Sequence, residues 1–471
     1  MKVLLVTGRF AEKMVRENSG GADVLVLDID VAAFITDKHL EDINLSGYDL
    51  VLVPGLAKGN WRKLEEKKGV AIRLGPVHAY DIPKVMEVIE EIELSHEIPA
   101  DRLLNLNREE ELFKLVNGLD VGVFDINGIQ IGGNSRMKIV AEIVDATELE
   151  RDELIQRIEY YLESGADIID LGIPISYDLS DVRRAVKTAR DYCDALSIDT
   201  FSKKAIEVGI AAGVDMIMSI SLKNLEVLEL IKDQAVVVVE KNVDMLKHTV
   251  ELVKTKTNKV IADPVLEIFG VFESLSRYKR FREIDPITPM LFGVGNITEL
   301  FDADSHGINA IIAYIAEEIG ADLLFTTEAS PKTVNSIREL KIASYMSKGS
   351  KIKKTPPKDL GLSLLVIKEK VRYPEAELPD CLKAKEKKEF IRDPKGDFRI
   401  WLSKGWIVCS HEKVCVVGKD AKSIIDTVLD LDLVSRLDHA AYLGRELKKA
   451  EIALRLKKNY IQDQELNFGI Y

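Results

Sequence analysis

The sequence has few cysteines, and none of them are spaced to share a metal ion. Its 471 residues contain only Cys193, Cys381, Cys409 and Cys415. No Cys-x-x-Cys pair occurs, which argues against the common cysteine-rich zinc sites. Scattered cysteines of this kind are typical of reduced thiols in the cytoplasm. We therefore predict a cytoplasmic protein that binds no metal ion.

Long hydrophobic runs and an excess of positive charge are also missing. No segment approaches the ~18 consecutive apolar residues of a membrane-spanning helix. The apolar run at the N-terminus is short and is followed by Arg9, which predicts a buried first strand rather than a signal peptide. Lysine and arginine total 65 against 78 aspartate and glutamate, a net charge of −13. An acidic chain is a poor partner for a phosphate backbone, so we predict neither nucleic acid nor membrane as a partner.

The length and composition are those of a globular protein of about three domains, at roughly 150 residues per domain. The hydrophobic fraction of 46% allows a large core. We predict domains at residues 1–119, 120–350 and 351–471. A charged segment that contains Pro356 and Pro357 begins the third section and is typical of a linker.

The first section alternates strand-like and helix-like segments, which predicts a Rossmann-like parallel α/β domain. It lacks a Gly-x-Gly-x-x-Gly motif, so a dinucleotide-binding role is not expected and a structural or docking role is favoured. The third section predicts a small α+β domain, with a long amphipathic helix over residues 437–457. Its expected strands lie at residues 362–366, 399–402, 405–409 and 413–417.

The middle section predicts a (β/α)₈ barrel that is preceded by a hairpin. Asn127-Gly128 is a strong signal for a tight turn between two short strands over residues 121–133. Eight strand–helix units in a section of this size fit a closed barrel, and a doubly wound sheet is the alternative. The expected strands are 138–144, 167–171, 195–199, 216–220, 235–239, 259–262, 290–294 and 322–325. The expected helices are 151–164, 182–192, 203–212, 225–232, 244–254, 272–282, 307–319 and 332–348.

Carboxylate and amide side chains follow the predicted strands, at the end of a barrel where active sites lie. No histidine occupies a strand end, and basic residues there are few. Such a mouth suits a neutral ligand rich in N–H donors, such as an aminopyrimidinone ring, better than a phosphate. The candidate site residues are Glu142, Asp170, Asp199, Ser219, Asp263 and Asn296.

Four segments in order, 163–172, 196–200, 211–217 and 261–264, resemble the pterin-binding superfamily. That superfamily holds the dihydropteroate synthases and the methyltetrahydrofolate:corrinoid methyltransferases. The whole chain resembles the archaeal dihydropteroate synthase-related proteins. The resemblance implies a reduced pterin as substrate, a tetrahydromethanopterin or tetrahydrofolate derivative, and a place in one-carbon metabolism.

The same resemblance assigns roles to individual residues. Asp199 matches the strand-three acid that grips the pterin ring, and Asp263 matches the strand-six acid that binds the aminopyrimidinone edge. The strand-four asparagine of the superfamily is replaced by Ser219. The loop 144–149 adds negative charge where a synthase handles diphosphate. The loop 293–298 is similar to that of the methyltransferases, which makes Asn296 the residue near N5 of the pterin.

These comparisons predict a pterin-dependent methyltransferase with Asn296 and Asp199 as catalytic residues. No Asp-x-His-x-x-Gly motif for corrinoid binding is present, so the methyl acceptor is expected on a separate corrinoid protein. Two alternatives stay open. One is a synthase-like condensation of a pterin methyl diphosphate with an arylamine, and the other is a non-catalytic pterin-binding subunit of a larger complex. A homodimer is the expected assembly.

Simpler structural roles compete with these assignments. Asp199 could cap the helix that follows it, Asp263 could shape a turn before Pro264, and Asn296 could occupy a tight turn. Asp302, Asp304 and His306 resemble a metal cluster on paper, but a loop and a helix cap are favoured. Lys241 and Arg282 either contact a pterin tail or are solvated surface charges.

Overall fold

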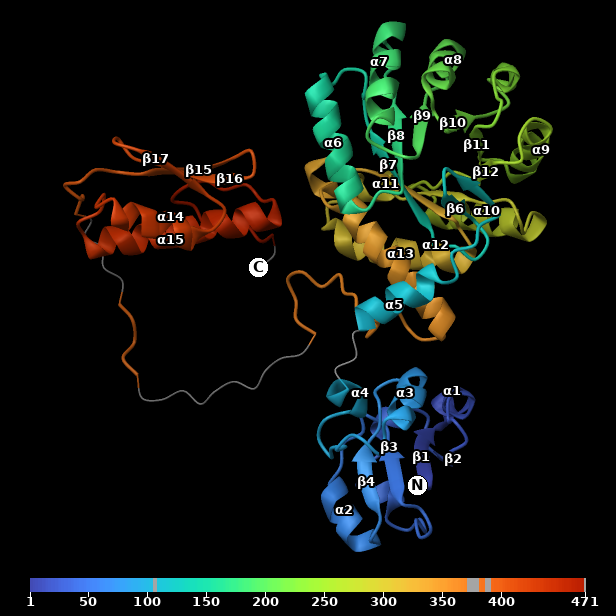
Figure 1. The fold of residues 1–471 in the computed structure, drawn as a ribbon, viewed down its shortest axis with the longest axis vertical. Coiled ribbons are helices and arrows are strands. Elements are labelled where there is room, and N and C mark those ends of the chain that lie inside the picture. The colour runs from blue at the N-terminus through green and yellow to red at the C-terminus, as the bar shows by residue number, and fades with distance from the viewer. Residues whose placement is uncertain (105–107, 371–380, 386–390, 470–471) are drawn as a thin grey trace. The chain divides into compact units, whose positions relative to one another are not determined.

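The computed structural model describes residues 1–104, 108–370, 381–385 and 391–469. They form two compact units, Met1–Lys368 and Glu369–Tyr471 (Figure 1). The larger unit contains an N-terminal sheet, a hairpin and a barrel. The division at residues 119 and 350 stays a prediction, because both positions lie inside the larger unit.

The N-terminal sheet is parallel and is covered on both faces. It consists of β1 (Val3–Gly8), β2 (Asp23–Leu27), β3 (Leu50–Val53) and β4 (Ala71–Leu74), in the order β2-β1-β3-β4. Alternate residues of β1 enter two separate buried clusters. One includes Trp61 of α2 (Trp61–Lys68), and the other includes Val85 of α3 (Ile82–Glu87). The predicted Rossmann-like α/β arrangement is confirmed.

Eight parallel strands form the barrel, in the order β12-β11-β10-β9-β8-β7-β14-β13. A bridge between Ala262 and Met290 joins the two end strands and closes the ring. The barrel is therefore confirmed over the doubly wound alternative. Its strands are β7 (Lys138–Ile143), β8 (Ile168–Gly172), β9 (Leu196–Asp199), β10 (Met216–Ile220), β11 (Ala235–Val239), β12 (Val260–Asp263), β13 (Leu291–Gly293) and β14 (Leu323–Thr327).

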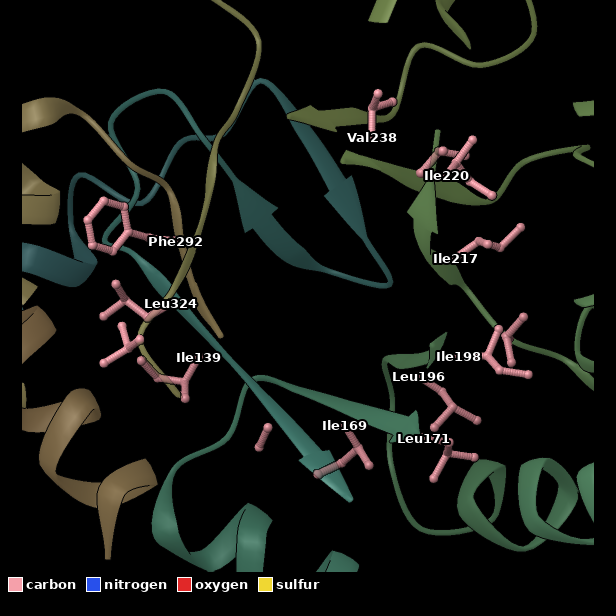
Figure 2. Close-up of a cluster of buried hydrophobic side chains, with 14 of the residues drawn as sticks. Ile139, Ile169, Leu171, Leu196, Ile198, Ile217, Ile220, Val238, Phe292 and Leu324 are labelled. Atoms are coloured by element: carbon pink, nitrogen blue, oxygen red, sulfur yellow. The ribbon is translucent and has the colours of Figure 1, made fainter. Parts of the chain in front are cut away.

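Alternate strand residues divide the barrel core into an outer and an inner layer. Outward side chains such as Ile139, Ile198 and Phe292 pack against the surrounding helices (Figure 2). Inward side chains such as Val140 and Ile261 form a second cluster inside the ring. The helices are α6 (Arg151–Ser164), α7 (Leu179–Arg190), α8 (Lys203–Ala212), α9 (Val243–Lys254), α10 (Val271–Ile284), α12 (Ser305–Ile319) and α13 (Ser336–Lys353).

The hairpin of β5 (Phe124–Ile126) and β6 (Ile129–Ile131) closes the N-terminal end of the barrel. Ile126 and Ile131 are buried in the inner cluster. The Asn127 amide donates hydrogen bonds to the Asp194 carbonyl at 2.7 Å and to Asp215 Oδ1 at 2.9 Å. Asp194 and Asp215 lie just before β9 and β10, so the hairpin turn sits at the end opposite to the barrel mouth.

Two predicted elements are wrong. Residues 225–232 form only a short 3₁₀ turn, η5 (Leu225–Glu229). The Ser221 N–H donates a hydrogen bond to Asn224 Oδ1, so a tight turn occupies the segment just before Leu225. Residues 362–366 form no strand. Leu362 and Leu364 instead pack singly against buried clusters of the larger unit, so their apolar character reflects burial without strand pairing.

The C-terminal unit is a small α+β fold, as predicted. An antiparallel sheet of β15 (Arg399–Ser403), β16 (Trp406–Ser410) and β17 (Cys415–Gly418) packs one face against two helices. These are α15 (Leu437–Leu456), which the sequence predicts, and α14 (Ala421–Asp430), which it does not. Among the described residues, no helix is both long and apolar enough to cross a membrane.

The hairpin contributes to barrel stability because its side chains fill the N-terminal end. Ile131 is fully buried. Replacing Ile131 with alanine should lower the opening free energy of the barrel strands by about 2–5 kcal/mol. Hydrogen exchange with mass spectrometry measures this on barrel peptides. Val121→Ala, at an exposed side chain nearby, should change it by less than about 0.5 kcal/mol. Equal protection of the barrel peptides in the two variants would contradict a stabilising role of the hairpin.

Candidate active site at the barrel mouth

Strand register brings acidic side chains from separate strands to one level inside the barrel. Glu142 of β7 pairs with Asp170 of β8, and Asp170 pairs with Ser197 of β9. Thr327 of β14 pairs with Glu142 from the other side. Asp199 lies two residues further along β9, nearer the mouth. The barrel geometry, rather than sequence proximity, therefore assembles the site.

Glu142, Asp170 and Asp199 form an acidic cluster. Each contributes a carboxylate oxygen, and these oxygens all lie within 4.8 Å of one another. Asp170 is fully buried. Its Oδ1 accepts a hydrogen bond from the Ser197 hydroxyl, and its Oδ2 has no partner among the described residues. Burial and the charges of Asp199 and Glu142 hold the pKa of Asp170 well above its usual range. Burial, with the Asp199 charge, raises the pKa of Glu142 to about 7.

Gly172 makes room for this cluster. It pairs with Asp199 at the end of β8, and a Cβ atom at this position would lie 2.6 Å from Glu142 Oε1. Any side chain here would displace the Glu142 carboxylate. The need for glycine at position 172 is therefore steric, and the spacing of the sequence motif does not reveal it.

Ser219 supports Asp199 from the neighbouring strand. Its hydroxyl donates a hydrogen bond of 2.7 Å to Asp199 Oδ1, which counteracts the increase in the Asp199 pKa that burial causes. The register of β10 is irregular between Ile217 and Ile220, and Ser219 has a left-handed φ of 65°. A non-glycine residue in this conformation is uncommon, and here it turns the hydroxyl toward Asp199.

Asp263 ends β12 in a partly buried position. Its Oδ1 accepts hydrogen bonds from the Val265 N–H at 2.8 Å and from the Tyr278 hydroxyl at 2.9 Å. Burial raises its pKa to about 6, and the charge of Asp199 adds to the shift. Sequence reasoning missed Tyr278, which is fully buried on α10. The available signal was a tyrosine on the apolar face of a helix, because a buried hydroxyl needs a partner.

Asn296 lies beside the loop that follows Asp263, in the short helix α11 (Gly295–Thr298). Its amide nitrogen donates a hydrogen bond of 2.9 Å to the Leu266 carbonyl, and the side chain is exposed. Glu299, just past the end of this helix, is close enough to raise the pKa of Glu142. Asn296 therefore borders the mouth but is not part of the acidic cluster.

A cleft of about 550 Å³ opens beside the cluster, between the loops that follow β7, β8 and β9. Glu142, Asp145 and Asp199 supply its charged lining, and its lining residues include neither lysine nor arginine. The other lining residues are apolar, hydroxylated or glycine: Val144, Gly172, Ile173, Pro174, Ile175, Tyr177, Thr200, Phe201 and Ser202. The lining of the cleft therefore combines acidic side chains with apolar and hydroxylated ones.

Other candidate residues lie elsewhere. A pterin contact for Arg282 is wrong, because this residue binds the Gly320 carbonyl and Asp322 at the N-terminal end of the barrel. Lys241 stays at the mouth and pairs with Glu267 at 2.5 Å. Asp304 precedes the first residue of α12, and Asp302 pairs with Lys332. Within the described ranges, these aspartates and His306 do not form a metal-binding group.

Two family models match the chain. One, described as pterin binding enzyme, covers residues 142–321, and the other, described as PterinBD-DUF4346, covers residues 392–463. The protein MJ0107 of Methanocaldococcus jannaschii is 37% identical over an alignment of 526 positions that covers 99% of each chain.

Solved structures of two dihydropteroate synthases are also similar. The Yersinia pestis enzyme with a pterine-sulfa conjugate is 17% identical, with a TM-score of 0.39, over 49% of this chain and 96% of its own. The Thermus thermophilus enzyme in complex with 6HMPPP is 20% identical, with a TM-score of 0.37, over 44% of this chain and 92% of its own.

The raised pKa of Asp263 predicts a pH-dependent stability. The folded protein holds the Asp263 proton more tightly than the unfolded chain, whose aspartate pKa is about 3.9. The free energy of unfolding therefore falls as pH rises from about 4 to 6, and the loss persists above that range. Asp263→Asn keeps the Oδ1 acceptor and cannot ionise.

We expect the stability of Asp263→Asn relative to wild type to increase by about 1–2 kcal/mol between pH 5 and pH 8. Denaturant unfolding of both proteins at each pH measures this difference. A difference that is the same at both pH values would show that Asp263 ionises as in the unfolded chain.

Proposed function

We propose that this protein, which belongs to the pterin-binding enzyme superfamily and to the family of MJ0107, transfers a methyl group from N5 of a reduced pterin to an external corrinoid. The observation that carries this proposal is the pair of partly buried acids, Asp199 and Asp263, at the ends of β9 and β12. The cleft beside Asp199 has neither lysine nor arginine among its lining residues. The pterin is a tetrahydromethanopterin or tetrahydrofolate derivative.

The two acids suit the nitrogen-rich edge of a pterin. Asp263 Oδ1 is already occupied by two donors, and its Oδ2 has no hydrogen bond from the described residues. Asp199 likewise uses Oδ1 for the Ser219 hydroxyl. Each acid thus has an oxygen left for the N–H groups of an aminopyrimidinone, which prefer a carboxylate acceptor. We assign Ser219, Glu142 and Asp170 to the same site.

Methyl transfer requires help at the leaving nitrogen, because a methyl group on a tertiary amine is a poor electrophile. The Co(I) acceptor supplies the electron pair of the new Co–C bond, and the pair of the broken C–N bond stays on N5, which gains a proton. An amide that donates to N5 stabilises the charge that develops there. Asn296 uses one amide hydrogen for Leu266 and keeps a second one for this role. Asp199 relays the proton through water.

The surface around the mouth supports a protein-bound acceptor. Exposed large apolar side chains follow several barrel strands, including Ile175 after β8, Phe201 after β9 and Phe269 after β12, and Phe272 is exposed in the first turn of α10. Exposed apolar groups in functional loops are typical of protein-binding surfaces. A corrinoid protein that docks there would present its cobalt to the pterin.

The charge of the cleft disfavours the condensation reaction. A pterin methyl diphosphate would bring its negative charges next to Asp145, Glu142 and Asp199, and the cleft lining offers no lysine or arginine to offset them. Coulomb repulsion between like charges at such distances opposes binding. The methyl transfer reaction requires no anionic group at this position.

Asn296→Ala tests the methyl transfer. We expect kcat to fall by about 10²–10³ with a smaller change in KM, because one donor to the transition state is lost. The assay follows methylcobalamin formation from the methylated pterin and reduced cobalamin without oxygen. Lys223→Ala, an exposed side chain in the loop after β10, serves as the control and should behave as wild type. An Asn296→Ala variant with wild-type kcat would remove Asn296 from the mechanism.

The condensation reaction predicts a different product. With a pterin methyl diphosphate and an arylamine, we expect no release of pyrophosphate, measured by a coupled phosphate assay. Release at a rate that depends on both substrates would replace methyl transfer with synthase chemistry. Pterin binding by calorimetry without turnover in either assay would instead identify a non-catalytic pterin-binding subunit.

A further inference from the structure

A second cavity lies at the N-terminal end of the barrel, opposite to the mouth. Its volume is about 360 Å³, and it is bordered by segments that lead into three barrel strands. Ser135 precedes β7, Pro286 precedes β13 and Asp322 precedes β14. Residues from the end of α12 and from α13 complete its lining. Because small-molecule sites in proteins have volumes of about 300–1,000 Å³, this cavity is large enough for a small ligand.

The charged side chains of the lining include more cations than carboxylates. Lys351 Nζ donates a hydrogen bond of 2.9 Å to Glu317 Oε1, and Arg282 donates one of 3.0 Å to Asp322 Oδ2. The third cation is Lys348, whose ammonium lies 3.8 Å from Glu317 Oε1, beyond hydrogen-bond distance. Three cations and two carboxylates give the lining a net charge of +1.

Lys348 is the charged group of this cavity that lacks a hydrogen-bond partner. Only 8% of the residue is exposed, and its ammonium donates no hydrogen bond to the described residues. Buried polar groups are almost always hydrogen-bonded, and burial of a charge without an acceptor is costly. A nine-tenths buried ammonium in the lining of a cavity therefore points to a ligand that supplies acceptor oxygens.

We propose that this cavity binds a small organic carboxylate, whose charged group accepts hydrogen bonds from Lys348. A carboxylate carries one negative charge, which balances the net charge of the lining. A phosphate group carries about −1.5 to −2 charges at neutral pH, and the excess would be repelled by Glu317 and Asp322. The chemistry of the lining therefore favours a carboxylate over a phosphate.

Apolar side chains in the same lining suit the hydrocarbon part of such a ligand. Val123 and Ile287 both line the cavity, and they are 46% and 68% exposed in the described structure. A hydrocarbon body would cover part of this apolar surface, which is favourable. The site goes beyond the proposed function, because it lies at the opposite end of the barrel and takes no part in methyl transfer.

Binding of cyclohexanecarboxylate to the full-length protein tests the proposal. Isothermal titration calorimetry at neutral pH should show one bound cyclohexanecarboxylate per chain, with a Kd below about 1 mM. Lys348→Met removes the ammonium and should weaken binding about 10–100-fold. Glu317→Gln removes a repelling charge and should tighten binding about 2–10-fold. Circular dichroism checks that both variants fold.

Two controls locate the ligand and identify its class. Lys256→Met makes the same change at an exposed lysine at this end of the barrel, and it should bind cyclohexanecarboxylate as wild type does. Inorganic phosphate should bind at least about tenfold more weakly than the carboxylate. Wild-type protein that binds no cyclohexanecarboxylate at about 10 mM would overturn the site. Unchanged affinity in Lys348→Met, or tighter binding of phosphate than of the carboxylate, would also overturn the proposal.

Discussion

Burial of carboxylates without basic partners is the constraint on which this site depends. An ionised carboxylate inside a protein is unfavourable unless hydrogen bonds, a cation or a proton compensate for the lost solvation. The barrel mouth gathers Glu142, Asp170, Asp199 and Asp263 and raises the pKa of each. The negative charge of such a site is not compensated within the protein, so its ligands are groups that supply positive charge or N–H donors.

The rest of the barrel keeps this unfavourable arrangement in place. The ring is closed by the bridge between β12 and β13, and the hairpin fills its N-terminal end. Strand register then fixes the level of each acid, and Gly172 leaves space for the Glu142 carboxylate. The large buried cluster between strands and helices provides the stability that offsets the cost of the mouth (Figure 2).

The sequence predicts the parts of the site that depend on local pattern. Acids that end apolar runs identify Asp199 and Asp263, because strand ends of a barrel share one face. It cannot predict features that arise only between strands. The irregular register at Ser219 and the Tyr278 hydroxyl bound to Asp263 depend on strand register and helix packing. Arg282 shows the converse, since a helical pattern does not reveal which end of the barrel a side chain faces.

The central claim is that the mouth holds a reduced pterin by its nitrogen-rich edge. A crystal structure of the protein with a bound methylated tetrahydropterin, grown without oxygen, tests it most directly. The account predicts that the aminopyrimidinone edge donates hydrogen bonds to Asp199 and Asp263, with the N5 methyl group facing the open mouth beside Asn296. A pterin bound elsewhere, or bound at the mouth without contact to either acid, would contradict it.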